Sequence, residues 1–496
     1  MSLKSIAIKS IAPYIKASTQ RQSRNGVSDQ DKWMTNLIQK AKHTQFGKDH
    51  YFNKIKSYSD FKQNIPVRDY EGLRPYIDRV VQGEANIVWP GRPKYFGKTS
   101  GTTSGVKYIP ITKDSIGHHI SSARNAILHY VADTRSNLFD GRMIFISGSP
   151  TLTKKSGIAT GRLSGIVNHE IPSWVKGNQL PSWQTNCIED WETKLDNIVE
   201  ETYNQDLRLI SGIPPWVQMY YERLLSKTGK ATIKEIFPNL ELFIYGGVNY
   251  TPYKASIDRL HGQEIATLET YPASEGFIAY QDNYLEKSLM LNTNAGMFFE
   301  FVPIKDFLQN KPNRISLRDV EINKDYALIL STNAGLWGYS LGDTIRFVNL
   351  DPYRIIVSGR IKHFISAFGE HVISKEVEEA MQAAALKHNL IIHEFSVAPQ
   401  VNPPDGSLPY HEWFVDMENT NIPISEIEAT IDNAVTMQNI YYKDLIDGQI
   451  LRPLRIRRVV TGAFHEYMDS IGKLGGQNKV PRLKNDRSLV EKLQLL

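Results

Sequence analysis

Residues 241–247, ELFIYGG, form a short run of apolar and aromatic residues that ends in a pair of glycines. Runs of this kind, bounded by Gly, Asn or Pro, are typical of strands buried in a sheet. Three more runs share the pattern: MIFIS (143–147), YALILST (326–332) and RIIVSG (354–359). Helical patterns lie between them, for example at 190–204 and 215–226. This alternation predicts a large mixed α/β body.

The pattern changes after about residue 362, where two helical segments alternate with two strand-like ones. The helix SKEVEEAMQAAALKHN (374–389) has Ser374 as its expected N-cap. The other segments are the strand-like IIHEFSVA (391–398) and HEWFVDM (411–417), and the helical 424–438. We therefore predict a large domain over 1–361 and a small C-terminal α+β domain over 362–496, with the boundary at a turn at Gly359–Arg360.

The composition is that of a globular protein. The 496 residues are 41% hydrophobic and 22% charged, and 58 basic against 53 acidic residues give a net charge of +5. So dilute a charge argues against a nucleic-acid partner. The basic run RPLRIRR (452–458) alternates with apolar residues and is interpreted as a solvated strand face. The single cysteine, Cys187, excludes an intrachain disulfide and a cysteine zinc cage, and favours a reducing compartment.

No apolar run approaches the roughly 18 residues that a membrane-spanning helix needs, so no membrane partner is expected. The N-terminal stretch MSLKSIAIKSIAPYIKAS is interrupted by lysines and has no secretory core. Leu3, Ile6, Ile11 and Ile15 fall near helical spacing and predict an amphipathic helix docked on the body, the alternative being a helix on a membrane surface. The expected location is the cytoplasm.

The stretch TSGTTSGVK (99–107) supplies glycines, hydroxyl residues and a lysine ahead of the strand-like YIPIT (108–112). Glycines allow backbone N–H groups to turn toward an anion, and hydroxyls add donors, so this loop suits a polyphosphate. Its spacing is neither that of the Walker loop nor that of the dinucleotide fingerprint. The alternative is a flexible surface linker.

Two later turns carry carboxylates. In YPASEG (271–276), Glu275 could hold Mg²⁺ beside nucleotide phosphates, because magnesium takes few carboxylates and keeps waters. In YSLGD (339–343), Asp343 follows an expected turn glycine between two strands, and its two oxygens match a ribose diol. Each carboxylate could instead lie in an ordinary solvated turn.

Two further segments complete an ordered set: GRIKHFISAFGEHV (359–372) and GGQNKVPR (475–482). The set resembles the adenylate-forming superfamily of acyl-CoA ligases, luciferases and peptide-synthetase adenylation domains. TSGTTSGVK matches its phosphate loop, YSLGD its ribose segment and GRIKHFISAFGEHVISKEVE its hinge. YPASEG, NAGLWGYSLGD (333–343) and GGQNKVPR make the chain most similar, over about residues 90–485, to the auxin-responsive acyl-acid amido synthetases of the Gretchen Hagen family. Ser340 stands where the superfamily often has an arginine. Any contact usually made by that arginine is therefore in doubt for this chain, whereas the nucleotide site itself is not.

The resemblance implies a role for each matching position. ATP would be bound, with Mg²⁺ at Glu275, by residues of the loop and turns: Ser100, Gly101, Thr102, Thr103, Lys107, Tyr271, Ser274, Glu275, Asp343 and Arg360. Lys479 would be catalytic, at the α-phosphate and the acyl carboxylate. Lys362 would lie at the hinge, and Arg124 would meet the acyl carboxylate or line its pocket.

The implied activity is an ATP-dependent ligase that adenylates a small carboxylic acid and passes the acyl group to the amine of an amino acid. The small domain would close over the large one to exclude water. No base for the amine can be named: His169, His363 and His371 are candidates only through their proximity to motifs. The alternatives are an acyl-CoA ligase that uses the same adenylate, and a nucleotide-binding sensor without catalysis. The acid, the acceptor and the choice between monomer and homodimer stay open.

Overall fold

The computed structural model describes residues 2–100, 106–247, 250–309, 313–360, 364–365, 372–447, 451–475, 478–484 and 486–496. Two compact units make up the chain: Met1–Val248 with Leu260–Val357, and Asn249–Arg259 with Ser358–Leu496. The chain passes between them inside β16 (Tyr353–Arg360). The turn predicted at Gly359–Arg360 is therefore wrong, because the strand continues through both residues. The predicted domain limits at 361 and 362 fall on residues outside the described ranges.

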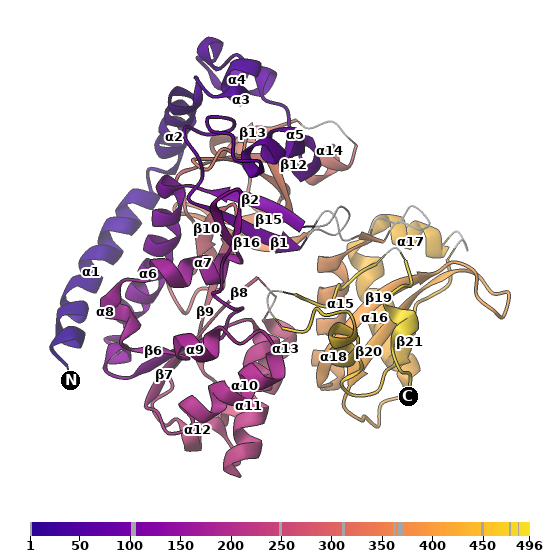
Figure 1. Ribbon diagram of the computed structural model, residues 1–496. Helices are drawn as coiled ribbons and strands as arrows, with labels where there is room; N and C mark the ends of the chain where they lie inside the picture. Colours follow the sequence, from indigo (N-terminus) through magenta and orange to yellow (C-terminus); the bar gives the residue numbers. More distant parts are fainter. Residues whose placement is uncertain are drawn as a thin grey trace. The chain divides into compact units, whose positions relative to one another are not determined.

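The first unit is built around a twelve-stranded sheet of described strands, in the order β13-β12-β14-β15-β16-β11-β10-β9-β8-β7-β3-β6 (Figure 1). Its strands are β3 (Arg142–Phe145), β6 (Gln179–Leu180), β7 (Leu207–Ser211), β8 (Leu242–Gly246), β9 (Ala266–Ala273), β10 (Gly276–Tyr280), β11 (Leu289–Leu291), β12 (Met297–Pro303), β13 (Ile315–Ser316), β14 (Asp325–Thr332), β15 (Tyr339–Leu350) and β16. All four strands expected from their apolar runs are confirmed, as β3, β8, β14 and β16, within one or two residues.

One half of this sheet is parallel. β6, β3, β7, β8 and β9 are neighbours that run in the same direction, and the pairing becomes antiparallel from β9 to β10. The carboxyl ends of these five strands consequently lie along one edge, which is where open α/β sheets bind ligands. The other half packs its aromatic and aliphatic side chains into a buried cluster that includes Phe299, Phe301 and Phe347.

A smaller sheet of the same unit carries the predicted phosphate loop. Its order is β2-β1-β5-β4, with β1 (Tyr95–Ser100), β2 (Val106–Ile111), β4 (Thr153–Lys155) and β5 (Ile158–Gly161). The helices of the unit are α1 (Leu3–Ser23), α2 (Gly26–Ala41), α3 (Gln45–Asp49), α4 (Tyr58–Asn64), α5 (Tyr70–Val81), α6 (Lys113–Thr134), α7 (Leu163–Glu170), α8 (Ser173–Lys176), α9 (Trp183–Asn186), α10 (Trp191–Thr202), α11 (Pro214–Thr228), α12 (Ile233–Ile236) and α14 (Ile304–Leu308). α10 and α11 confirm the helices expected at 190–204 and 215–226.

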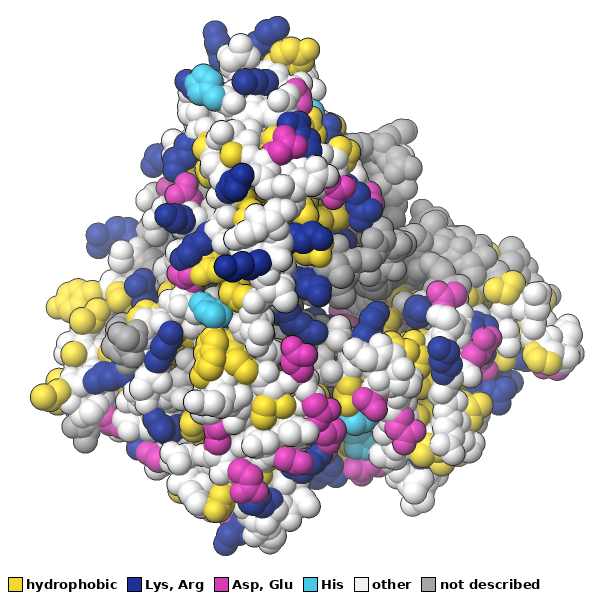
Figure 2. Space-filling view, viewed as in Figure 1, with side chains coloured by type: hydrophobic (Ala, Val, Ile, Leu, Met, Phe, Trp, Pro, Cys, Tyr) yellow, Lys and Arg dark blue, Asp and Glu magenta, His cyan; other side chains and the backbone are white. Residues whose placement is uncertain are grey.

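The N-terminal helix docks along α6, as predicted, but through a different face. Ala12 is buried there, with Ile8 and Ile15 packed beside it, whereas Leu3 is 87% exposed. Polar contacts fix this rotation, because Lys4 donates to Asn178 at 2.6 Å. Lys9 likewise donates to Asn137 at 2.6 Å, and Lys16 pairs with Asp133. The expected docking residues Leu3, Ile6 and Ile11 are instead exposed. Figure 2 shows apolar side chains on the surface at the left of the view.

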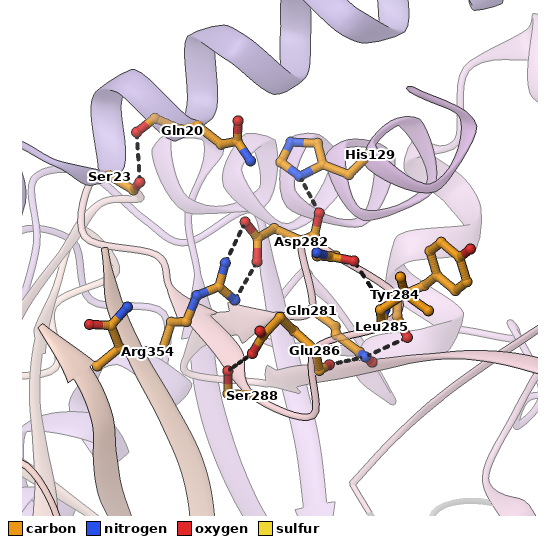
Figure 3. A network of polar contacts seen from close by, with 12 residues as sticks. Gln20, Ser23, His129, Gln281, Asp282, Tyr284, Leu285, Glu286, Ser288 and Arg354 are labelled. Atoms are coloured by element: carbon orange, nitrogen blue, oxygen red, sulfur yellow. Dashed lines mark hydrogen bonds and ion pairs between the residues drawn. The ribbon is translucent and has the colours of Figure 1, made fainter. Parts of the chain in front are cut away.

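A polar network ties α1 and α6 to the sheet, and Figure 3 shows the part of it around Asp282. Arg354 of β16 forms a buried ion pair with Asp282, the second residue after β10, with 2.7 Å between Nη1 and Oδ1. The Asp282 carbonyl accepts from His129 Nδ1 of α6 at 3.3 Å. The other ring nitrogen of His129 lies 2.6 Å from Thr19 Oγ1 of α1. The network thus joins three elements that are distant in sequence.

The second unit is a sheet with helices, as expected for the small α+β domain. Its sheet, β19-β20-β21, consists of β19 (Ile392–Gln400), β20 (Tyr410–Met417) and β21 (Arg455–Arg458), and a separate strand pair joins β17 (Phe364–Ile365) to β18 (Val372–Ile373). The helices are α13 (Thr251–His261), most of which clusters with this unit, and α15 (Ser374–His388), α16 (Ile424–Gln438), α17 (Ile440–Asp447) and α18 (Ala463–Ser470). In β21, Ile456 is buried between exposed Arg455 and Arg457, which confirms the solvated strand face.

Two local predictions in this unit need correction. Ser374 is the first residue of α15, and the N-cap is Ile373. The Ile373 N–H donates to the Glu376 carboxylate at 2.9 Å, so a side chain inside the first turn takes over the capping role expected of the serine. In addition, α13 precedes the predicted boundary by about a hundred residues, yet Tyr253 on it accepts from Arg482 Nη2 at 3.0 Å.

Candidate active site

The predicted phosphate loop connects two antiparallel strands. β1 and β2 pair in a register that sets Thr99 opposite Lys107, so the loop between them leaves and re-enters the sheet at adjacent positions. Gly101, Thr102 and Thr103 lie outside the described residues, as does the side chain of Ser100. Their assignment to the triphosphate stays a prediction.

The second motif, YPASEG, forms the tight connection between β9 and β10. Ala273 pairs with Gly276, which leaves Ser274 and Glu275 as the turn. The turn lies directly against the loop hairpin: a Cβ added to Gly97 of β1 would lie 3.1 Å from the Ser274 hydroxyl. Glycine at this position therefore permits the close approach of β1. Ser274 and Glu275 are both buried, so the alternative of a solvated turn is wrong.

The third motif, YSLGD, lies within a strand. The expected turn between two strands is wrong, because Tyr339–Leu350 is one continuous strand, β15. Its register with β14 shifts around Gly342, which has a φ of 85° that favours glycine. The distortion is a β-bulge, and it brings Asp343 within reach of β9: Tyr271 donates its hydroxyl hydrogen to Asp343 Oδ2 at 2.5 Å, inside the protein.

Glu275 completes the cluster, and its charged neighbours are Lys107 and Asp343. Its carboxylate is hydrogen-bonded to Tyr339, the first residue of YSLGD. Burial raises the pKa of Glu275, and the charge of Asp343 raises it further, while the ammonium of Lys107 opposes the shift. Lys107 also lies over the ring of Tyr70, with its Nζ 5.6 Å from the centroid. Three motifs that are distant in sequence therefore meet at one buried, charged site.

Two tyrosines of this site were not assigned by the sequence. Tyr339 is the first residue of YSLGD, but in that motif only Asp343 was predicted to have a chemical role. Tyr70, at the start of α5, accepts from the Tyr108 N–H at 2.9 Å, and no pattern in the chain marks it. A backbone bridge between Arg68 and Tyr339 holds this segment beside β15. Tyr339 could have been found from its place in a recognised motif. Tyr70 could not, because only its contacts in the folded protein place it at the site.

The remaining predicted residues belong to α6, to α7, to the second unit or to segments outside the described ranges. Arg124 is exposed on α6 and donates to Asn125 at 3.0 Å. Lys479 and Arg360 belong to the second unit, and Lys479 is exposed there. Lys362, His363 and His371 lie outside the described residues. His169 is exposed, with its Nε2 2.9 Å from the Pro150 carbonyl oxygen, which is a structural role.

The donor set is consistent with one magnesium ion held mainly by a nucleotide. Among the described residues no group of three or more His, Cys, Asp or Glu could hold a metal by itself. Mg²⁺ requires fewer protein ligands, since it is usually bound by one or two carboxylates together with phosphates and waters. Glu275 offers one buried carboxylate whose raised pKa a nearby cation would lower, so its environment fits such an ion.

Comparison with protein families finds matches over most of the chain. Residues 16–186 match the GH3 family N-terminal domain, 290–360 the GH3 family central domain and 375–488 the GH3 family C-terminal domain. The chain belongs to the GH3 family. Within this GH3 chain, the N-terminal match includes Lys107 and the central match includes Tyr339 and Asp343. Glu275 lies between the two matched ranges.

Named relatives are similar along most of their length. The chain is 25% identical to indole-3-acetic acid-amido synthetase GH3.15 of Arabidopsis thaliana, over 87% of this chain and 86% of the relative. It is 23% identical to indole-3-acetic acid-amido synthetase GH3.4 of the same plant, over 93% and 89%. It is 22% identical to jasmonoyl--L-amino acid synthetase JAR4 of Nicotiana attenuata, over 85% of both chains.

Solved structures share the fold. The GH3.15 acyl acid amido synthetase superimposes with a TM-score of 0.80 at 18% identity, covering 97% of this chain and 96% of that one. A 2-hydroxyisobutyryl-CoA ligase in the postadenylation state superimposes with a TM-score of 0.58 at 11% identity, covering 92% and 89%. The mixed α/β architecture of adenylate-forming ligases, expected from the sequence, is thereby confirmed. No described helix is both long enough and apolar enough to cross a membrane.

Proposed function

We propose that this GH3 chain is an acid–amino acid ligase, which uses ATP to convert a small carboxylic acid into an acyl-adenylate and then transfers the acyl group to the amine of an amino acid. The observation that carries the proposal is the convergence of Lys107, Glu275 and Asp343, from three separate motifs, on one buried site. Membership of a family whose named relatives are amido synthetases supports it.

The residues suit the first half-reaction. A carboxylate that attacks the α-phosphorus of ATP brings two anions together, so positive charge and N–H dipoles must offset the charge that develops. The loop between β1 and β2, with Lys107, would hold the triphosphate and orient pyrophosphate as the leaving group. Asp343, steadied by Tyr271, would accept the ribose hydroxyls. Bound Mg²⁺, held by Glu275, would supply charge neutralisation at the phosphates.

The second unit would supply the remaining contacts. We assign Lys479 to the α-phosphate during adenylation and Arg360 to the ribose. Because an acyl-adenylate is hydrolysed by water, closure of the small domain would protect it until the amine arrives. The amine must be unprotonated to attack, and its base is still unassigned. Cytoplasmic location, monomeric or dimeric state and Mg²⁺ dependence stay predictions.

The deciding experiment measures exchange of labelled pyrophosphate into ATP over a panel of small carboxylic acids. Exchange that depends on one class of acid demonstrates adenylation and identifies the acid at the same time. The second step is then tested with the twenty amino acids and with coenzyme A as acceptors. Amide formation is the expected result, and thioester formation in its place would assign the chain to acyl-CoA ligases. Absence of exchange with every acid, in folded protein that binds ATP, would favour a nucleotide sensor.

A further inference from the structure

Two cations lie together in the first unit, and no carboxylate among the described residues forms an ion pair with either. Lys194, in the first turn of α10, is 2% exposed. Its ammonium donates to the carbonyl oxygens of Ser147 and Asn186, each at 2.8 Å. Arg162, at the N-cap of α7, is half-buried and acts on the charge of Lys194. The Arg162 guanidinium forms no hydrogen bond or ion pair within the described ranges, and its backbone carbonyl accepts from the Ile166 N–H at 3.0 Å.

The local chain shapes this pair. The Arg162 side chain lies across Gly148, where an added Cβ would be 3.1 Å from Arg162 Cδ. Because Gly148 has no side chain, the Arg162 guanidinium can approach the end of β3. The neighbouring Ser147 carbonyl there accepts from Lys194. Two buried polar atoms of the adjoining chain also lack partners in the described part of the protein. They are Oδ1 of Asn186, whose carbonyl binds Lys194, and the indole N–H of Trp191, which precedes Lys194 on α10. Unsatisfied buried groups are rare in native proteins and mark places where a ligand or water is expected.

The energetics call for an anion. Burial of a charge without a counter-ion costs several kcal/mol in proteins, and like charges at close range add to that cost. Desolvation lowers the pKa of Lys194 to about 8 and also lowers the pKa of Arg162. A carboxylate bound between the two side chains would offset both penalties, and the Arg162 fork could bind it through two parallel hydrogen bonds.

The topology places the pair on the ligand-binding edge of the sheet. Ser147 follows the carboxyl end of β3, and Glu275 follows the carboxyl end of β9, with β7 and β8 between them in a parallel run. Three strand spacings of about 4.8 Å separate the two ends by about 14 Å. The carboxylate of an α-amino acid is attached to the carbon that bears the amine, so it cannot reach that far from the reacting centre.

We propose, on the basis of the ligase function above, that Arg162 and Lys194 bind a second, non-reacting carboxylate of the acyl acid, so that the substrate of this chain is a dicarboxylic acid. One carboxylate would be adenylated beside Glu275 and Lys107, and the other would be held at the end of β3. The side-chain carboxylate of an acidic acceptor amino acid could also bind to Arg162 and Lys194. The experiment distinguishes this carboxylate from that of the acyl acid.

The first arm uses pyrophosphate exchange, which involves the acyl acid and ATP but no acceptor. The probes are the α,ω-dicarboxylates from adipate to dodecanedioate and their monomethyl esters, which keep the shape and lose one charge. We expect the best diacid to exceed its ester about tenfold in kcat/KM, equivalent to one ionic contact of about 1.4 kcal/mol. Arg162→Gln should remove that preference and leave exchange with the ester within about twofold. Lys154→Gln is the matched control, because it removes an exposed positive charge on β4 of the same unit.

A monocarboxylate as the best substrate in the exchange screen overturns the proposal and leaves the ligase function intact. Equal losses of diacid and ester in Arg162→Gln also overturn it. The second arm supplies presynthesised acyl-adenylate and compares aspartate with asparagine and glutamate with glutamine. If Arg162→Gln alters only this comparison, the site belongs to the acceptor, and the assignment to the acyl acid is wrong.

A third arm needs no turnover. Thermal unfolding is followed in sodium sulfate and in sodium chloride at equal ionic strength, for wild type, Arg162→Gln and Lys154→Gln. We expect the extra stabilisation by sulfate to be smaller in Arg162→Gln than in the other two proteins, because one of its anion sites is lost. An equal gain in all three excludes an anion site at Arg162. This result stands even if no acid supports exchange, so the anion site at Arg162 is tested separately from the ligase function.

Discussion

At the scale of single residues, the site depends on carboxylates that are held by tyrosines. Tyr271 donates to Asp343, and Tyr339 is bonded to Glu275. Each hydroxyl fixes the orientation of its carboxylate. The sequence identified both carboxylates because a ribose diol and a magnesium ion require that chemistry. It did not identify the tyrosine partner of Glu275, because the bulge at Gly342 decides which side chains of β15 face β9.

Asp343→Asn should weaken ATP binding by about 10- to 100-fold. The amide replaces one acceptor oxygen with a donor, so a ribose hydroxyl loses its partner at a cost of about 1–3 kcal/mol. Isothermal titration with ATP measures the change. Tyr271→Phe is the control, since it keeps the carboxylate and removes only the supporting hydroxyl, and it should cost less. ATP affinity equal to wild type in folded Asp343→Asn would remove this residue from the site.

Glu275→Gln should raise the magnesium concentration needed for half-maximal pyrophosphate exchange by about an order of magnitude. The substitution keeps the size and the contact with Tyr339 but removes the charge that a hard cation prefers. Titration of exchange activity with Mg²⁺ at fixed ATP gives the answer. Tyr339→Phe keeps the charge and should leave the magnesium curve close to that of wild type. Superimposable curves for Glu275→Gln and wild type would show that Glu275 does not bind the metal.

At the scale of elements, apolar periodicity found the strands and helices, and polar contacts decided how they dock. The four apolar runs became β3, β8, β14 and β16, and each pairs with neighbouring strands of the large sheet. The face of α1 was mispredicted, because its lysines bond to Asn137 and Asn178 and rotate Leu3 and Ile6 outward. Those asparagines lie more than a hundred residues away, so spacing within the helix carried no information about them.

The network that joins α1, α6 and β16 makes stability depend on pH. His129 is fully buried, and desolvation lowers its pKa from 6.5 to about 4. The folded state therefore keeps the ring neutral where the unfolded chain already binds a proton. The free energy of unfolding should fall as the pH drops from about 6.5 toward 4, by up to about 1.4 kcal/mol per pH unit for this group.

Urea unfolding between pH 5 and 8 tests this dependence. His129→Gln should be less stable than wild type at pH 8 and should show a shallower loss toward pH 5. His43→Gln, an exposed histidine of the same unit, should keep the wild-type slope. A wild-type slope in His129→Gln would mean that other groups, such as buried His119 and His261, account for the acid sensitivity.

At the scale of the whole molecule, the two units divide the proposed work. The first unit holds the cluster of Lys107, Glu275 and Asp343, and the second carries Lys479 between Gly475 and Arg482. From the change of pattern near residue 362 the sequence predicts a domain boundary there, and that boundary stays a prediction. The sequence could not predict that α13 clusters with the second unit, because that grouping depends on Tyr253 meeting Arg482 and Glu394 across more than a hundred residues.

Lys479→Ala should separate the two half-reactions. During adenylation charge builds on the α-phosphate oxygens, and an ammonium nearby stabilises that transition state more than the ground state. Pyrophosphate exchange should fall by about 10²- to 10³-fold, the usual effect of losing one oxyanion donor. Amide formation from presynthesised acyl-adenylate should persist. Lys473→Ala, another exposed lysine of the second unit, is the control. Near-normal exchange in Lys479→Ala would show that Lys479 does not take part.

The most direct measurement of the central claim is the product balance of one complete reaction. Protein, ATP, Mg²⁺, the acid found by exchange and an amino acid are incubated together, and the products are resolved by mass spectrometry. The ligase function predicts one amide, one AMP and one pyrophosphate for each acid consumed. Release of ADP and phosphate, or a thioester formed from coenzyme A in preference to the amide, would contradict it.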